Sequence, residues 1–210
     1  MNFQSGIYPD PNQRSSERYT RVFRPVVFRV EGCEGLCLVR NISAGGLMGD
    51  VPGDVQPGSV IEIDMNSAVQ LNGHVVWSNQ GQMGVHFDQP IDVQQVLQQI
   101  ARRIIDGKVQ RAPRLSVACE ADLHLGPTGF RVPVIDISQG GAKIVADFLT
   151  VGQEIMLVVD GLDSRRAHVC WKHAGRVGLA FFRQIKFSEL AGWAYERFRR
   201  LRDDHAPSNE

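Results

Sequence analysis

Absent from this sequence is any hydrophobic run approaching the roughly 20 apolar residues that a membrane-spanning helix needs. Its N-terminal stretch, MNFQSGIYPDPNQRSSER, also lacks the apolar segment of a secretory signal, so we expect a cytoplasmic protein with no membrane span. Net charge is absent too, because 23 basic residues balance 23 acidic residues. This balance argues against a protein that coats DNA or RNA, and any anion site must come from a local cluster.

The motifs of common catalytic sites are missing as well. The sequence contains no GxSxG elbow, Walker A loop, HExxH or GxGxxG, so we expect no enzyme and no cofactor. Cysteine is scarce, with only Cys33, Cys37, Cys119 and Cys170. Without an export signal we expect all four as reduced thiols. No second ligand pair follows Cys33 and Cys37 at zinc-like spacing, so no metal site is expected.

What the sequence does contain is an internal repeat. Four short segments recur in the same order at offsets of 93 to 95 residues, which is improbable by chance. They predict two homologous domains, at 14–106 and 107–204, between a disordered arm at 1–13 and a disordered tail at 205–210. The paired segments are Arg18–Arg21 with Arg111–Arg114, Asn41–Gly46 with Asp136–Gly141, Gly73–Trp77 with Ala167–Trp171, and Gly84–Phe87 with Gly178–Phe181.

Both repeats show the period of two that marks a strand with one buried face. Trp77 and Trp171 follow this alternation, which predicts that they lie in the core and that His74 and His168 face solvent. Gly-rich and Pro-rich turns separate several short strands, so the predicted fold is mainly β, with two tandem small antiparallel barrels. The other expected strands are 25–31, 35–41, 59–65, 82–88, 116–123, 130–136, 153–159 and 176–182.

A helical pattern ends each repeat. Apolar residues recur at i, i+3 and i+4 from Val93 to Ile105, with Asp92 as the N-cap and Gly107 as the stop. A second helix is predicted from about 188 to 202, with Ser188 as its cap. Each helix is expected to cover an open end of its own barrel or to pack between the two barrels.

One pattern at a strand end combines polar side chains with glycine. Asp136 and Ser138 lie two residues apart, so their carboxylate and hydroxyl are expected on the same face. The following glycines, ending at Gly141, permit either a positive φ or a close backbone approach. The first repeat carries the same pattern with an amide in place of the carboxylate, in Asn41, Ser43 and Gly46. Such a run is also typical of a simple β-turn.

A local cluster of arginines precedes the first repeat on this otherwise neutral chain. Guanidinium groups suit bidentate contact with phosphate and with the O6 and N7 atoms of guanine, and they stack on bases. An arginine-rich segment beside an Asn-Ser-Gly patch is therefore a plausible clamp for a guanine nucleotide. A solvated arm is the simpler alternative. The cluster consists of Arg14, Arg18, Arg21, Arg24 and Arg29, with Glu17 as its one acidic neighbour.

The order RxxxR, strand, (D/N)xSxxG, VxW and GxxF resembles the PilZ domain family, over about 14–106 and 108–185. The resemblance implies small β-barrels and a cytoplasmic bacterial receptor for cyclic di-GMP that signals to a protein partner. In that family the arginines contact phosphates and guanines, and the Asp or Asn and the Ser hold a guanine edge or orient an arginine. The resemblance assigns ligand-binding roles to Arg14, Arg18, Arg21, Asn41, Ser43 and Gly46, and weaker roles to Arg111, Arg114, Asp136, Ser138 and Gly141.

The arginine motif departs from the family pattern. Literal RxxxR is formed by Arg14 and Arg18, whereas counting back from the strand makes Arg21 the second arginine and puts Glu17 in the first position. In the second repeat Gln110 occupies the first position. Losing one phosphate contact costs roughly 1.5–3 kcal/mol, so we predict that the first domain binds better than the second.

Three hypotheses remain open from sequence. The first is a cyclic di-GMP receptor in which binding rearranges the two domains. The second is a degenerate PilZ protein that binds no nucleotide and acts as a protein–protein adaptor, for which Gln110 and Glu17 are the motivation. The third is single-stranded nucleic-acid binding by a small barrel, which the neutral charge disfavours. A homodimer is possible on these grounds, but the sequence does not require one.

Overall fold

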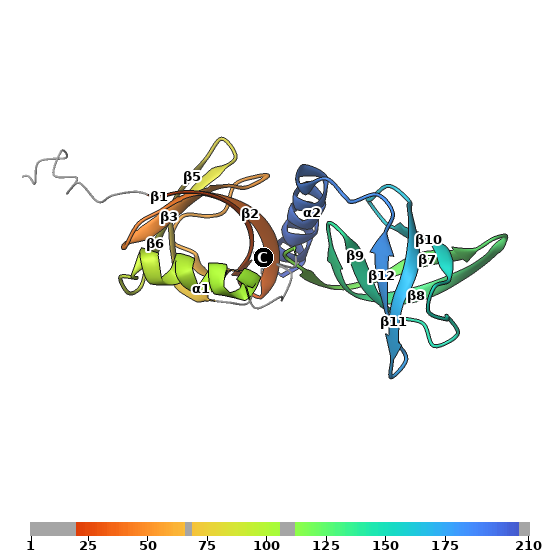
Figure 1. Cartoon of the computed structure of the whole chain (residues 1–210). Helices are drawn as coiled ribbons and strands as arrows, with labels where there is room; N and C mark the ends of the chain where they lie inside the picture. Colours follow the sequence, from red (N-terminus) through yellow and green to blue (C-terminus); the bar gives the residue numbers. More distant parts are fainter. Residues whose placement is uncertain (1–19, 66–68, 106–111, 206–210) are drawn as a thin grey trace, which may run out of the picture.

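The computed structural model describes residues 20–65, 69–105 and 112–205. Figure 1 shows two β-barrels with helix α2 between them. Each barrel consists of six antiparallel strands and is followed by a helix, so the predicted fold class is confirmed. Predicted site residues Arg14, Arg18 and Arg111, and the arm at 1–13, lie outside the described residues.

The first barrel closes through the strand order β1-β2-β3-β6-β5-β4. The second barrel repeats this arrangement as β7-β8-β9-β12-β11-β10, read in the direction that matches the first. The strands are β1 Thr20–Val30, β2 Cys33–Ile42, β3 Gly46–Asp50, β4 Val60–Asp64, β5 Gln70–Asn79, β6 Gln82–Phe87, β7 Leu115–Leu125, β8 Thr128–Ser138, β9 Gly141–Val145, β10 Glu154–Val159, β11 Arg165–His173 and β12 Arg176–Phe181.

Strands β3 and β9 are the ones that the sequence did not predict. Each has five residues and begins at the last glycine of the motif, at Gly46 and Gly141. Both strands are essential for closure, because each lies between two other strands of its barrel. The two glycines are required by packing. A Cβ atom on Gly46 would lie 2.2 Å from the Val85 carbonyl oxygen, and one on Gly141 would lie 2.0 Å from that of Leu179.

The predicted burial of the two tryptophans is wrong. Trp77 is 40% exposed and Trp171 is 42% exposed. A β-bulge adds one residue to β5 between Val75 and Trp77, and the same bulge follows Val169 in β11. One extra residue inverts the side-chain alternation, so each indole lies outside the barrel.

Each exposed indole covers a glycine of the neighbouring strand. A Cβ atom on Gly84 would lie 2.1 Å from Nε1 of Trp77, and one on Gly178 would lie 2.0 Å from Nε1 of Trp171.

Helix α1 spans Val93–Ile105 and packs on the first barrel. Its start agrees with the prediction, because the Gln95 amide donates to Oδ1 of Asp92 at 3.0 Å. Val96 and Ile100 are buried in the core of the first barrel. The helix therefore buries an apolar face against the domain that precedes it.

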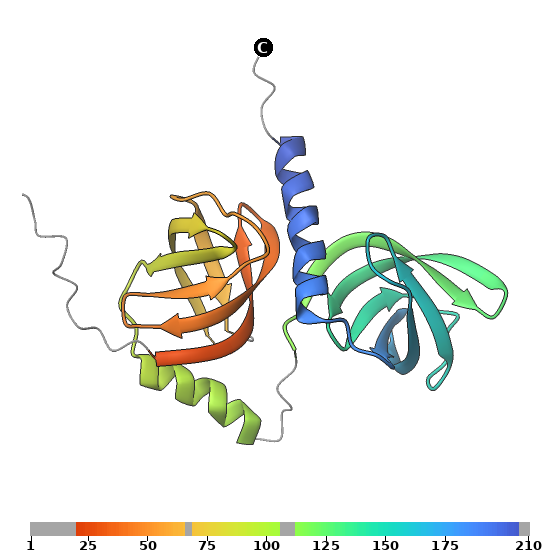
Figure 2. The ribbon, with the colours of Figure 1, turned by 90° about the horizontal axis from the view of Figure 1, so that it is seen from above.

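Helix α2 spans Phe187–His205 and begins one residue before the predicted cap, so Ser188 lies inside the first turn. In Figure 2 the helix stands between the two barrels. Its first half packs into the second core, where Leu190 and Ala194 are buried. Farther along, Phe198 is buried in the core of the first barrel instead. The helix is thus shared by both domains.

Helix α2 packs against the β1–β2 hairpin of the first barrel. Val26, Val27 and Phe28 are consecutive and all buried, which an alternating strand achieves only when both of its faces are covered. Phe28 meets Phe198 edge to face, with ring centroids 6.4 Å apart. The Tyr195 hydroxyl donates to the Asp54 carbonyl at 3.0 Å. These contacts place the two barrels against each other through the helix.

Candidate functional site

A row of outward-facing residues crosses five strands of the first barrel. Its members are direct cross-strand partners, so neighbours are separated by roughly 5 Å. The row begins on β1 and ends at the exposed tryptophan on β5. It consists of Arg21, Asn41, Met48, Gly84 and Trp77. The equivalent row in the second barrel is Ser116, Asp136, Lys143, Gly178 and Trp171.

These rows correct the expected correspondence between the repeats. The offset of 93 pairs Arg21 with Arg114, but the strand register pairs Arg21 with Ser116, because Arg21 lies opposite Asn41 and Ser116 lies opposite Asp136. Arg114 lies two residues earlier than that position. The prediction that Arg21 and Arg114 are equivalent is therefore wrong, and each arginine approaches its motif from a different place.

An open hollow of about 640 Å³ surrounds Arg21 and Asn41 on the first barrel. Two predicted site residues are thus brought together. The β5–β6 turn contributes Gln80, Gly81 and Gln82 to one side of the hollow. The sequence did not predict the rest of the lining, which consists of Phe23, Arg40, Met48 and Asp50.

Arg40 reaches the hollow because of a bulge in β2. Val39 pairs with Gly49 and Asn41 with Met48, so Arg40 is the extra residue between two successive pairs. Arg40 and Asn41 are therefore consecutive residues that both lie on the outside, while Val39 is fully buried. No periodicity in the sequence predicts this, because the bulge breaks the alternation.

The guanidinium group of Arg40 is held on several sides. Its Nε donates to Oδ2 of Asp50 at 2.6 Å, and Nη2 forms an ion pair with the same oxygen. Gln82 Nε2 donates to the other carboxylate oxygen at 3.1 Å. The Arg40 hydrogen bond is the main reason that the pKa of Asp50 lies below its ordinary value. The guanidinium also lies over the Phe23 ring, 5.1 Å from its centroid.

Ser43 and Gly46 shape the β2–β3 turn and do not line this hollow. Ser43 is only 4% exposed, and its hydroxyl donates to the Gly46 carbonyl at 3.3 Å. The turn also anchors the chain that leaves β6, because the Ile91 amide donates to the Ala44 carbonyl at 2.9 Å. The serine and glycine of the motif therefore have a clear structural role in this barrel.

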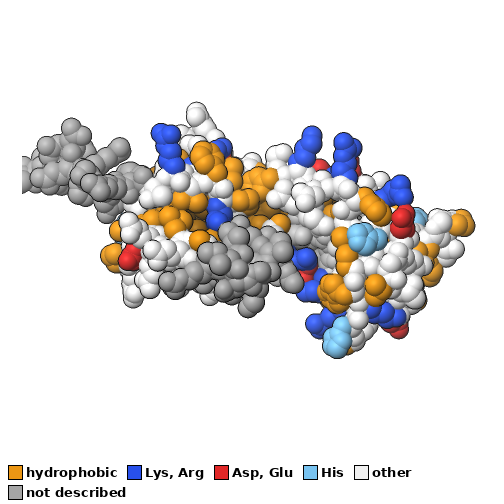
Figure 3. All heavy atoms as spheres, viewed as in Figure 1, with side chains coloured by type: hydrophobic (Ala, Val, Ile, Leu, Met, Phe, Trp, Pro, Cys, Tyr) orange, Lys and Arg blue, Asp and Glu red, His pale blue; other side chains and the backbone are white. Residues whose placement is uncertain are grey.

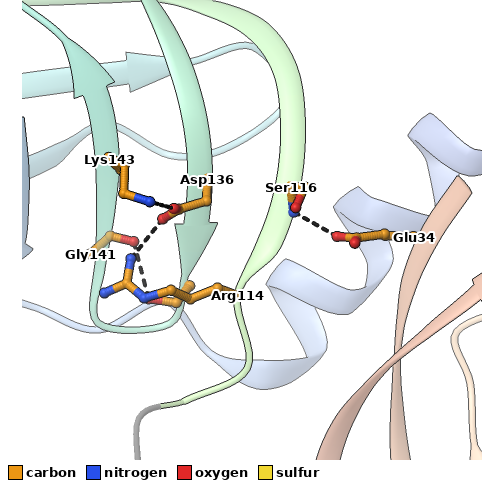
Figure 4. Close-up of polar contacts among 7 residues, drawn as sticks. Glu34, Arg114, Ser116, Asp136, Gly141 and Lys143 are labelled. Carbon is orange, nitrogen blue, oxygen red and sulfur yellow. Dashed lines mark hydrogen bonds and ion pairs between the residues drawn. The ribbon is translucent and has the colours of Figure 1, made fainter. Parts of the chain in front are cut away.

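In the second barrel the motif carboxylate is already engaged by two cations, as Figure 4 shows. Asp136 is 7% exposed and accepts hydrogen bonds from Arg114 Nη1 at 2.7 Å and from Lys143 Nζ at 2.5 Å. The Ser138 hydroxyl donates to the Gly141 carbonyl at 3.1 Å, as in the first barrel. Asp136, Arg114 and Lys143 form a compact ion cluster, and any anion would have to compete with this carboxylate for the two cations.

Figure 4 also shows a contact between the barrels next to this cluster. Oε2 of Glu34, on β2 of the first barrel, accepts a hydrogen bond from the Ser116 amide at 2.6 Å. Its Oε1 accepts from Arg29 Nε at 2.8 Å. Ser116 is the strand partner of Asp136, so the first barrel holds the strand that carries the second motif.

The prediction that both histidines face solvent is confirmed for His74 and wrong for His168. His74 is exposed and lies 3.2 Å from Asp88, as expected for a solvent-facing residue. His168 is half-buried because its ring packs against that of Phe182, with the ring centroids 5.4 Å apart.

All four cysteines are free thiols, as predicted. Burial raises the pKa of the Cys37 thiol to about 12, so this cysteine is unreactive at neutral pH.

Over the described ranges, no three side chains among His, Cys, Asp and Glu are grouped to hold a metal ion. None of the described helices is long and apolar enough to cross a membrane. On the face shown in Figure 3, lysine and arginine side chains are spread over both barrels and form no continuous basic tract.

The family model of the PilZ domain matches residues 12–106 and, separately, residues 108–191. The chain belongs to the PilZ domain family. The resemblance inferred from the motifs is therefore confirmed. The first matched segment covers the first barrel with helix α1, and the second covers the second barrel and only the start of helix α2. No curated protein matches the chain significantly.

Several solved structures are similar to this tandem PilZ chain. One is PlzA of Borreliella burgdorferi in complex with c-di-GMP, with 11% identity, a TM-score of 0.39, and coverage of 82% of this chain and 86% of that one. The inhibitor of motility MotI/DgrA of Bacillus subtilis has 12% identity and a TM-score of 0.36, covering 87% and 100%. YcgR of Escherichia coli in complex with c-di-GMP has 14% identity and a TM-score of 0.35, covering 87% of each chain.

Proposed function

We propose that this chain is a non-catalytic cyclic di-GMP receptor of the bacterial cytoplasm and that its first PilZ domain binds the nucleotide. The observation that carries the proposal is the hollow in which Arg21 lies opposite Asn41. An arginine and an amide on adjacent strands match the two needs of a guanine nucleotide, which are charge for the phosphate and hydrogen bonds for the base edge.

The state of the cations supports the first domain over the second. Asn41 is neutral, so it cannot hold Arg21 in an ion pair. In the second barrel the equivalent Asp136 already engages Arg114 and Lys143. In this proposal Arg14 and Arg18, which precede β1 in the sequence, complete the cationic side of the site. Ser43 and Gly46 act by fixing the turn beside it.

We also propose that nucleotide binding is signalled to a protein partner. Any domain rearrangement on binding must keep helix α2 packed on the first barrel, because separation of the barrels would expose Phe198 to water. A small adjustment around the Glu34–Ser116 contact avoids that exposure. We therefore propose that the partner recognises a local change at the junction of the barrels.

Calorimetric titration of the full chain with cyclic di-GMP tests the receptor function. We expect one site, and Arg21→Ala should weaken it about tenfold to a hundredfold, as the loss of a charged hydrogen bond predicts. Arg14→Ala and Arg18→Ala, measured separately, identify the arginine register. Arg131→Ala is the matched control, because Arg131 pairs with Glu120 and Asp122 on the second barrel. Absence of binding at tens of micromolar refutes the proposal.

The second candidate is a PilZ adaptor that binds a protein and no nucleotide. The closed ion cluster at Asp136 favours this role for the second barrel. Its exposed apolar side chains, which a protein partner would cover, include Val145, Phe148 and Val151. A pull-down in which the partner binds equally with and without cyclic di-GMP supports the adaptor.

A further inference from the structure

The hollow on the first barrel contains a feature that no motif residue explains. Arg40 is fixed between a carboxylate and an aromatic ring, and its side chain remains 36% exposed. Asp50 engages Nε and Nη2, which form one edge of the planar guanidinium group. The guanidinium carbon lies over the Phe23 ring, 5.1 Å from the ring centroid. The plane is therefore held in one orientation before any ligand arrives.

The charge of Arg40 is largely offset by Asp50, so attraction of a phosphate is not its main contribution. What the pair offers a ligand is a flat, preoriented surface. Guanidinium planes stack on nucleobases, and a plane that is already fixed loses little conformational entropy when it does so. Stacking also requires no particular base edge, since every base has a π face.

Position supports the same role. Arg40 is adjacent to Asn41 in the sequence, and the bulge in β2 turns both residues to the outside. Arg21 lies directly opposite Asn41 on β1. A cation, an amide and a stacking plane thus converge on one hollow, from two adjacent strands.

The second barrel lacks this arrangement as a complete set. By the strand register, Phe23 corresponds to Ala118, Arg40 to Ile135 and Asp50 to Val145. All three replacements are apolar, so the ring, the cation and the carboxylate that holds it are lost together. We expect such a joint replacement if the three residues act together, because none of them alone forms a fixed guanidinium plane.

We propose that Arg40, held by Phe23 and Asp50, is a base-stacking residue of the nucleotide site in the first PilZ domain. The inference rests on the proposed function and adds to it a contact that the RxxxR and NxSxxG motifs do not contain. Arg40 supplies the plane against which a guanine packs, while Arg21 supplies charge and Asn41 a hydrogen-bonding edge.

Titration of the full chain with cyclic di-GMP at two salt concentrations tests this role. Arg40→Lys keeps the charge and loses the plane, and Arg40→Ile copies the residue of the second barrel. Both should weaken binding about tenfold, as the loss of one stacking contact predicts, and Arg40→Lys, which keeps the charge, should leave the salt dependence of affinity unchanged. Arg21→Ala should instead reduce the salt dependence, because it removes a phosphate contact. Arg131→Ile is the matched control on the second barrel.

The outcomes separate the two levels of the proposal. If the unmodified chain binds no cyclic di-GMP, the receptor function fails and the stacking role fails with it. If the chain binds and Arg40→Lys keeps its full affinity, the receptor function stands and the stacking role is refuted. Loss of affinity in Arg40→Ile alone would mean that charge matters and the plane does not. Circular dichroism and thermal unfolding establish that each variant is folded, and Arg40→Lys preserves the ion pair should Arg40→Ile unfold.

Discussion

The two PilZ domains share a strand order, the positions of their bulges and an outward-facing row, yet they use their cations differently. In the second barrel Asp136 binds Arg114 and Lys143, and the three charges satisfy one another. In the first barrel the same position is the neutral Asn41. The carboxylate near this position is Asp50 on β3, which pairs with Arg40. A duplicated scaffold can therefore keep its geometry while a few side chains decide whether its cations are available to a ligand.

The largest expected effect follows from a difference between the two hydrophobic cores. The first barrel includes Phe198 of α2 in its core, so it depends on a residue that follows the second barrel in sequence. We expect Phe198→Ala to lower the free energy of unfolding by about 3–4 kcal/mol, from lost burial and the cavity that remains. Urea unfolding measures this loss.

Hydrogen exchange then shows which barrel responds. Phe198→Ala should speed amide exchange mainly in β1 and β2, whereas Leu190→Ala, in the second core, should do so mainly in the second barrel. The exposed Arg200→Ala on the same helix is the control and should change stability by less than about 0.5 kcal/mol. Equal exchange in both barrels after Phe198→Ala would mean that they unfold as one unit.

The next test removes the negative charge of Asp136, which pairs with both cations of the second barrel's motif. Asp136→Asn leaves Arg114 and Lys143 without their carboxylate, and we expect a loss of about 2 kcal/mol, moderated because both cations reach water. The reciprocal Asn41→Asp should change stability by no more than about 0.5 kcal/mol, since its neighbours Arg21 and Met48 are outside the core. Chemical unfolding of both variants compares the two sites, and equal losses would contradict the distinction drawn between them.

A smaller effect is expected at the contact between the barrels. Glu34 and Arg29 correspond in the second barrel to Gly129 and His124, so this contact has no counterpart there. Glu34→Ala should cost about 1 kcal/mol, because the Ser116 amide loses its acceptor but lies near water. Glu34→Gln keeps an acceptor and should lose less. If both variants match the unmodified chain in urea, the contact does not stabilise the junction.

The smallest expected effect is a pH dependence. The hydrogen bond from Arg40 lowers the pKa of Asp50 below its ordinary value of 3.8. A lowered folded-state pKa gives stability that is present above pH 3.8 and is lost as the pH falls through the folded value. Asp50→Asn should therefore be less stable than the unmodified chain at pH 6, and the gap should close below pH 4. Thermal unfolding across that range measures it, and a constant gap would show that the charge of Asp50 is not its source.

Periodicity and repeats predicted much of the fold. Alternation identified most strands, and the i, i+3, i+4 spacing with Asp92 identified α1. The short strands β3 and β9 escaped because each has five residues and begins at a glycine that also reads as a turn. The tryptophans were misplaced for a related reason. A bulge shifts the alternation by one residue, and a bulge leaves no mark in a hydrophobic pattern.

The candidate site was predicted only where motif residues form it. Arg21 and Asn41 meet in the hollow, but Phe23, Arg40 and Asp50 come from β1, β2 and β3 and are assembled by a bulge. Their pairing is a tertiary contact, which local sequence does not encode. The predicted equivalence of Arg21 and Arg114 was wrong because it came from matching the residue types of the two segments. The strand pairing instead places Ser116 at the position of Arg21.

The position of Phe198 has a consequence for synthesis on the ribosome. The β1–β2 hairpin is made early, but the aromatic ring that packs against Phe28 is encoded more than a hundred residues later. During translation the part of that hairpin that α2 later covers stays exposed to water until the helix is made. Of the two barrels, the one that comes earlier in the sequence is completed later, and its apolar surface needs protection until helix α2 emerges.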